Sequence, residues 1–185
     1  MSLLVVALVP GLVAGWAVGG RLGRLAELHL RAPGVIFAAA ALQLALVFAP
    51  TGLRPAGLIV SSVLVGVWLV LNAGRRTPLL AVAVGLLALG WILNLAAMIP
   101  NRGMPVSGAA MASIGAPPET DVADGSLYKH VAADRHTTLP WLGDVIPVRP
   151  LGAVVSAGDI VMAIGVALVL VGGMARRESP LPVPA

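Results

Sequence analysis

Long apolar blocks dominate this chain and constrain its fold more than any other feature. A helix needs about 20 apolar residues to cross the hydrocarbon core of a bilayer. Only 11% of the residues are charged, against roughly 25% in a soluble domain. These observations exclude a soluble globular enzyme and predict an all-α integral membrane protein. The predicted five-span helical bundle has its spans at about residues 2–20, 35–50, 56–73, 79–99 and 153–174.

The arginines predict the orientation of the bundle. Alternate connections between the apolar blocks are basic, and short basic loops mark the cytoplasmic face. These arginines are Arg21, Arg24, Arg31, Arg75, Arg76, Arg176 and Arg177. The N-terminus is then outside and the C-terminus inside the cytoplasmic membrane. The long segment 100–152 forms an ordered extracytoplasmic loop over the mouth of the bundle. Residues 1–178 form a single membrane domain, and the proline-rich tail 179–185 is disordered.

The charge and the missing cysteines narrow the partners. The net charge is +4, but no basic run with interleaved aromatic residues exists, so we expect no nucleic-acid partner. The chain has no cysteine, which excludes thiol catalysis and thiolate metal sites. We expect no cofactor, and membrane lipids are the expected surroundings.

Glycines recur on one face of two predicted spans. A stripe of small residues lets a neighbouring helix approach closely, which favours packing inside the bundle, with oligomer formation as the alternative. The first stripe is Gly11, Gly15, Gly19 and Gly23, and the second is Gly158, Gly165 and Gly172. The segment 20–31, with leucines at every third position, predicts a short interfacial helix.

Two acidic residues are the strongest candidates for chemistry. Asp159 lies within a predicted span, where ionisable groups are costly and often functional. Asp144 precedes it at a similar predicted depth, and Asn94 and Asn101 lie two turns apart on one helical face. Four polar groups are thus predicted to converge at the outer face. Two adjacent carboxylates would share one proton, so that one polarises water and the other donates to a scissile carbonyl.

Ordinary structural roles remain open for the same residues. The run Ser156-Ala-Gly-Asp159 fits a capping box with aspartate in place of glutamate, and Asp144 fits a turn after Gly143. His130, Asp134 and His136 have side chains that can bind zinc. A solvated loop or a structural ion pair is the favoured interpretation of these residues, so we expect no metal site.

Three short motifs resemble known families. The motifs are Asn-x-Gly-Met-Pro at 101–105, Leu-Gly-Asp-x-Ile-Pro at 142–147 and Ser-x-Gly-Asp at 156–159. They resemble those of an uncharacterised bacterial family of small multi-span proteins, known only as a domain of unknown function. The last third also resembles lipoprotein signal peptidase, an intramembrane aspartyl peptidase. On that resemblance, Asp134-Arg135 matches the Asp-Arg pair of the peptidase, and Asp144 and Asp159 match its catalytic dyad.

These patterns lead to one leading hypothesis and two alternatives. The leading one is an aspartyl hydrolase of the outer leaflet that cleaves a membrane-inserted peptide or lipoprotein. Asp144 and Asp159 would then be catalytic, Asn94 and Asn101 would orient the substrate backbone, and Arg135 would hold the loop. The first alternative is a small transporter, or a lipid- or ion-binding protein, that uses Asp159. The second is a non-catalytic subunit of a membrane complex.

Overall fold

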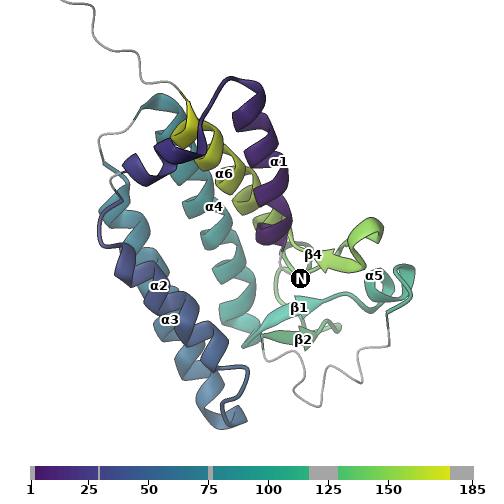
Figure 1. Ribbon diagram of the computed structural model, residues 1–185. Helices are drawn as coiled ribbons and strands as arrows, with labels where there is room; N and C mark the ends of the chain where they lie inside the picture. The colour runs from purple at the N-terminus through teal and green to yellow at the C-terminus, as the bar shows by residue number, and fades with distance from the viewer. Residues whose placement is uncertain (1–2, 29, 75–76, 117–128, 176–185) are drawn as a thin grey trace, which may run out of the picture.

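The apolar blocks of the sequence form the main helices of the protein. The computed structural model describes residues 3–28, 30–74, 77–116 and 129–175, and in these ranges the chain is mostly helical (Figure 1). The apolar helices are α1 (Leu3–Ala17), α2 (Pro33–Ala45), α3 (Arg54–Asn72), α4 (Pro78–Asn101) and α6 (Ala157–Met174). Three of them, α3, α4 and α6, are long and apolar enough to cross a membrane, whereas α1 and α2 are shorter. The tail 179–185 lies outside the described residues.

The helices differ from the predicted spans at several ends. The first ends at Ala17, two residues before Gly19, which adopts a left-handed φ of +76°. The second begins earlier than predicted, at Pro33, and ends earlier, at Ala45, because residues 46–49 form turns before Pro50. The last begins at Ala157 rather than 153, because Ser156 is its N-cap.

Short strands make the prediction of an all-α protein wrong for the segment after α4. Strands β1 (Met104–Val106) and β2 (His130–Ala132) pair in parallel. Strands β3 (Ile146–Val148) and β4 (Ala153–Val155) pair antiparallel. The four strands contain valine and isoleucine, whose branched side chains suit a sheet. In the sequence, however, these apolar residues resemble part of a membrane-spanning helix. In the described parts of this segment, the other elements are α5 (Gly108–Ser113), η5 (Pro140–Leu142) and η6 (Arg149–Leu151).

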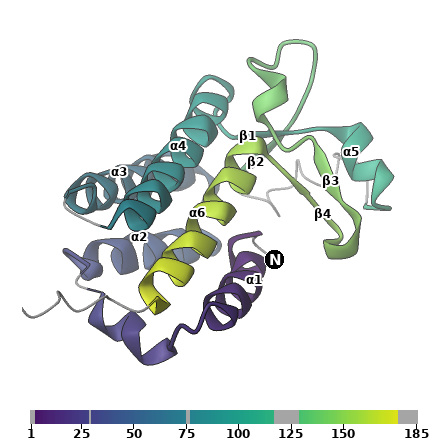
Figure 2. The ribbon, with the colours of Figure 1, turned by 90° about the horizontal axis from the view of Figure 1, so that it is seen from above.

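Glycines close one side of the bundle. Helix α6 packs between α4 and α1 (Figure 2). A Cβ atom at Gly11 would collide with the Ala167 backbone, and one at Gly165 would lie 3.0 Å from the Ala83 carbonyl oxygen. The predicted packing of glycines inside the bundle is confirmed at Gly11, Gly15, Gly158, Gly165 and Gly172. Gly19 and Gly23 face open space instead.

Helices α2 and α3 form a hairpin that is tied at both ends. At one end, the buried Asn72 side chain accepts from the Arg31 backbone N–H and donates to the Arg31 carbonyl oxygen, each at 3.0 Å. At the other end, the Gln43 amide donates to the Ser61 hydroxyl at 2.9 Å. The hairpin lies beside α4 in Figure 1 and packs on it only lightly.

The segment after α1 returns to the C-terminal end of α6. It contains the 3₁₀ helix η1 (Leu22–Glu27), whose three-residue period matches the spacing of the leucines. Gly173 of α6 has Leu25 and Leu28 against it. The Met174 carbonyl oxygen accepts from the Arg21 backbone at 3.0 Å and from the Arg24 guanidinium at 3.2 Å. Arg21 and Arg24 therefore lie at the C-terminal end of α6.

Candidate functional site

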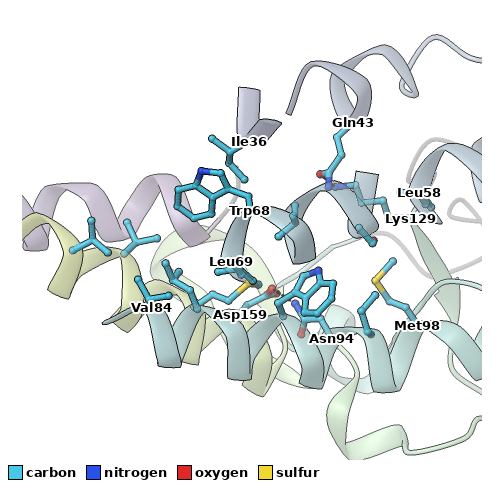
Figure 3. A pocket seen from close by; sticks show the side chains of 18 of the residues that line it. Ile36, Gln43, Leu58, Trp68, Leu69, Val84, Asn94, Met98, Lys129 and Asp159 are labelled. Atoms are coloured by element: carbon cyan, nitrogen blue, oxygen red, sulfur yellow. Dashed lines mark hydrogen bonds between the residues drawn. The ribbon is translucent and has the colours of Figure 1, made fainter. Parts of the chain in front are cut away.

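A cavity of about 570 Å³ lies between the α2–α3 hairpin and the α4–α6 pair (Figure 3). Its lining follows one face of α4, at spacings of three and four residues that place side chains in a single stripe. This face consists of Leu80, Val84, Leu87, Trp91, Asn94, Leu95 and Met98. Similar stripes come from α3 and α6, so most of the wall is apolar.

The polar side chains gather at one end of this cavity. They come from α2, α4, α6 and the segment between α4 and α6, which are far apart in the sequence. The group consists of Gln43, Asn94, Lys129, His130, Asp144 and Asp159, which we call the polar end. Figure 3 shows Gln43 and Lys129 meeting on one side, with Asn94 and Asp159 beside each other on α4 and α6. The Lys129 ammonium donates to the Gln43 side-chain oxygen.

Asp159 is held by the start of its own helix and by α4. Ser156 and Asp159 form a reciprocal capping box, which confirms the structural role predicted for this pair. Asn94 bridges to both residues: its amide donates to Asp159 Oδ1 at 2.9 Å, and its oxygen accepts from the Ser156 hydroxyl at 3.0 Å. Gly158 permits this close approach, because a Cβ atom there would collide with the Asn94 oxygen.

Asp144 is positioned by strand β1 and pairs with a histidine. The backbone of residue 144 joins one edge of β1, where its N–H donates to the Pro105 carbonyl at 2.8 Å and its carbonyl accepts from Ser107 at 3.0 Å. Strand β2, which begins at His130, lies on the other edge. The two side chains meet, with His130 Nε2 and Asp144 Oδ2 3.2 Å apart. The sequence analysis missed this pair, because nothing in the spacing predicts a strand between them.

Burial shifts the pKa values of two side chains at the polar end, Asp144 and Lys129. Burial raises the pKa of Asp144, whereas the hydrogen bond and charge of His130 oppose that rise and the charge of Asp159 adds to it. Burial also lowers the pKa of Lys129, and the charge of Asp159 opposes that shift. The two predicted acids therefore interact electrostatically, although each has its own hydrogen-bond partners.

Several polar atoms around the cavity are buried without a hydrogen-bond partner. Within the described parts of the chain, these atoms are Trp68 Nε1, Trp91 Nε1, His130 Nδ1 and Asp144 Oδ1. All four residues line the cavity. Buried polar groups in proteins are nearly always paired, so a set of unpaired atoms around one cavity points to a ligand that carries the missing partners.

Two of the predicted site residues have other roles. Asn101 is on the same helix as Asn94, but its amide donates to the carbonyls of Ala97 and Thr138, and its oxygen accepts from the Thr138 backbone. It therefore fastens the loop to α4. Arg135 is exposed and donates to His136 at 3.2 Å. Of the predicted residues, only Asn94, Asp144 and Asp159 line the cavity.

The histidine cluster considered for zinc does not assemble. His130 faces Asp144, while the exposed Asp134 accepts from the His136 backbone at 2.8 Å and from the Thr137 hydroxyl at 3.2 Å. These hydrogen bonds, first among them that from His136, lower the pKa of Asp134. Among the residues described, no group of three or more histidine and acidic side chains is arranged to hold a metal ion.

Comparison with known proteins gives a family without an assigned activity. A sequence family described as "Family of unknown function (DUF5317)" matches residues 27–171. The chain belongs to the DUF5317 family. All the cavity-lining residues, from Leu28 to Leu170, fall within the matched DUF5317 range, whereas α1 precedes it. No curated protein and no solved structure matches the chain, so the comparisons give no support for a resemblance to lipoprotein signal peptidase.

Proposed function

We propose that this DUF5317 protein binds a single-chain amphiphilic lipid in the cavity between the α2–α3 hairpin and the α4–α6 pair. The observation that carries the proposal is the distribution of polarity along the cavity. Its walls are apolar over most of their length, and titratable side chains gather only at the polar end. An apolar pocket with a few convergent polar groups is the usual form of a small-molecule site.

The dimensions of the cavity favour one hydrocarbon chain. The lining residues of α4 extend from Leu80 to Met98, a length of about 27 Å at 1.5 Å per residue. A volume of about 570 Å³ over that length corresponds to a mean cross-section of about 20 Å². A cavity of this length and volume can accommodate one extended acyl or isoprenoid chain.

The proposed setting is the cytoplasmic membrane, crossed five times with the N-terminus outside. Large apolar side chains such as Trp16 of α1 and Phe37 of α2 are exposed on the outer surface of the helices, as expected for contact with lipid. The shorter α1 and α2 would complete their crossings with the adjoining turns. Arg21, Arg24 and Arg31 lie near the C-terminal ends of α6 and α3, which supports a cytoplasmic position for that side. The polar end would then face outward.

Retention of a lipid by the purified protein tests this proposal. Val166 of α6 lines the cavity, and Val166→Phe would fill part of it. Val82 of α4 is 55% exposed on the outer surface, so Val82→Phe is a matched control. Native mass spectrometry should find one single-chain lipid on the wild type and on the control, and little or none on Val166→Phe. Equal occupancy in all three proteins, or none in any, would contradict the proposal.

A second candidate is intramembrane aspartyl hydrolysis by Asp144 and Asp159. It is supported by the presence of both carboxylates on one cavity and by the contribution of Asp159 to the raised pKa of Asp144. A protonated acid beside an ionised one suits general acid–base catalysis. Asp144→Asn and Asp159→Asn should each abolish cleavage of a membrane-inserted lipoprotein precursor while the variants remain folded. Normal processing by both variants would exclude the hydrolase.

A further inference from the structure

The polar end of the cavity is incomplete in a way that indicates the chemistry of its ligand. Asp144 is 5% exposed and uses Oδ2 for His130, while Oδ1 has no partner. His130 uses Nε2 for Asp144, while Nδ1 has none. The carboxylate oxygen requires a donor. The imidazole nitrogen requires a donor or an acceptor, depending on its protonation.

Building on the lipid-binding function proposed above, we propose that the ligand is a neutral monoacylated polyol, whose hydroxyl groups occupy the polar end. A hydroxyl both donates and accepts. One hydroxyl would donate to Asp144 Oδ1, and a neighbouring one would pair with His130 Nδ1 in either protonation state. A glycerol-like head provides adjacent hydroxyls of this kind on a single-chain lipid.

The charges at the polar end favour a neutral head over an ionic one. An anionic head would lie near the carboxylates of Asp144 and Asp159, and unpaired like charges are costly in a site shielded from water. A cationic head would compete with Lys129, whose pKa is lowered by burial, an effect that the charge of Asp159 opposes. Acidic and basic side chains already lie together at the polar end, so a head without net charge adds no unpaired charge there.

The tryptophans support an ester between the head and the tail. Trp91 lies one turn before Asn94 on α4, further from the polar end, and its ring packs on Gly66 of α3. Its indole N–H is buried without a partner, as is that of Trp68, and both residues line the cavity. An indole N–H can only donate. The ester oxygens of a monoacylated polyol would lie next to its hydroxyls, at the depth where Trp91 offers a donor.

The native tryptophans also provide the assay. Trp16→Phe and Trp141→Phe remove two exposed reporters, at 78% and 64% exposure, and leave Trp68 and Trp91. In phosphatidylcholine nanodiscs, a dibrominated monoacylglycerol should quench these two tryptophans. Unlabelled monooleoylglycerol, oleic acid, methyl oleate and an oleyl trimethylammonium salt are then added as competitors with similar tails. We expect monooleoylglycerol to restore fluorescence at about tenfold lower concentration than methyl oleate, because it makes hydrogen bonds to a charged group.

The variant Asp144→Ala separates the possible outcomes. It should reduce the preference for monooleoylglycerol to less than about threefold and leave competition by methyl oleate unchanged, which also reports an intact cavity. Equal competition by all four lipids, a preference for oleate or the ammonium salt, or an equal loss for every head in Asp144→Ala would overturn the assignment of the head. In each of these cases the lipid-binding function would stand. No competition by any of the lipids in the wild-type reporter would instead refute the lipid-binding function itself.

Discussion

The two sides of α4 are packed in opposite ways. On the closed side, α4 meets α6 through glycines at which an added Cβ atom would crowd backbone atoms of the partner helix, at 2.5 Å for Gly90, 2.7 Å for Gly158 and 3.0 Å for Gly165. On the open side, α4 faces α3 across the cavity, where the ring of Trp91 reaches over to Gly66. In a membrane, helices associate through close packing rather than through the hydrophobic effect. Small residues therefore allow the close packing of α4 on α6, whereas large residues keep α3 and α4 apart and leave the cavity between them.

Gly165→Val should break the closed side and cause the largest loss of stability. Its side chain would meet the Ala83 carbonyl and the Leu87 backbone N–H, each 3.0 Å from the new Cβ. Overpacking typically costs about 1–3 kcal/mol, and we expect the upper end because backbone cannot move aside easily. Gly85→Val is the control, since nothing lies within 4 Å of a Cβ there. Reversible unfolding in mixed micelles measures the difference, and similar losses in both variants would refute the comparison.

Asn94→Leu should weaken the closed side where α4 meets the start of α6. It leaves Asp159 Oδ1 and the Ser156 hydroxyl without their hydrogen bonds to α4. Removing one partner of a buried polar group costs about 1–3 kcal/mol. The variant should also impair lipid retention, because Asn94 lines the cavity. Asn101→Leu should loosen the loop at Thr138 without affecting retention, and equal retention by the two variants would contradict the assignment.

On the open side, the burial of Asp144 should make the stability of the protein depend on pH. Because burial raises the pKa of Asp144, the folded state holds the proton more tightly than the unfolded state. The contribution of Asp144 to the stability of the folded state is therefore full below the ordinary aspartate pKa of about 3.9. It is lost as pH rises through the pKa of Asp144 in the folded state. Asp144→Asn should therefore lose less stability than the wild type as pH rises from about 4. The measurement is the midpoint of unfolding as a function of pH.

Asp134 provides a control of opposite sign for that measurement. Hydrogen bonds from the His136 backbone, the first cause, lower the pKa of Asp134. Its contribution is therefore present above the ordinary aspartate pKa and is lost as pH falls through the folded pKa. Asp134→Asn should lose less stability than the wild type on acidification. If both substitutions changed the pH dependence of stability in the same direction, burial would not be what controls the pKa of Asp144.

Gly66→Ala should have the smallest effect on stability. The added methyl would lie 2.7 Å from the tip of the Trp91 ring, and a side chain can rotate away where backbone cannot. The higher helix propensity of alanine offsets part of the cost, by about 1 kcal/mol. We expect a change in unfolding free energy below about 1 kcal/mol, together with a shifted Trp91 emission maximum. A loss as large as that of Gly165→Val would mean that the two sides are equally rigid.

Much of the helical framework could be predicted from the sequence, because apolar blocks and glycine spacing are local patterns. The capping box at Ser156 and Asp159 was readable for the same reason, since it depends on residues three apart. The prediction differs from the structure where a short apolar run is compatible with either a helix or a strand. Residues 153–155 continue the apolar block in the sequence, yet they form β4 by pairing with a strand earlier in the chain.

The polar end of the cavity was only partly predictable, because it depends on long-range pairing. Asp144 and Asp159 were identified from their predicted depth, and both line the cavity. His130 was considered as a metal ligand or as part of a solvated loop or ion pair with Asp134 and His136. Its contact with Asp144 was not predicted, because that contact requires β1 to lie between β2 and residue 144. Asn101 shares a helical face with Asn94, but the loop at Thr138 occupies its amide. Helical periodicity predicts which way a side chain points, but it does not predict which residue of another segment will contact that side chain.

The ties at both ends of the α2–α3 hairpin determine how the cavity can change its size. Hydrogen bonds join Asn72 to Arg31 and Gln43 to Ser61. The hydrocarbon core of a membrane offers no replacement partners for these polar groups, so the hydrogen bonds resist separation of the two helices. The two helices should therefore move as one unit relative to the glycine-packed helices. Admission of the proposed lipid would then require the whole hairpin to shift, rather than α2 to separate from α3.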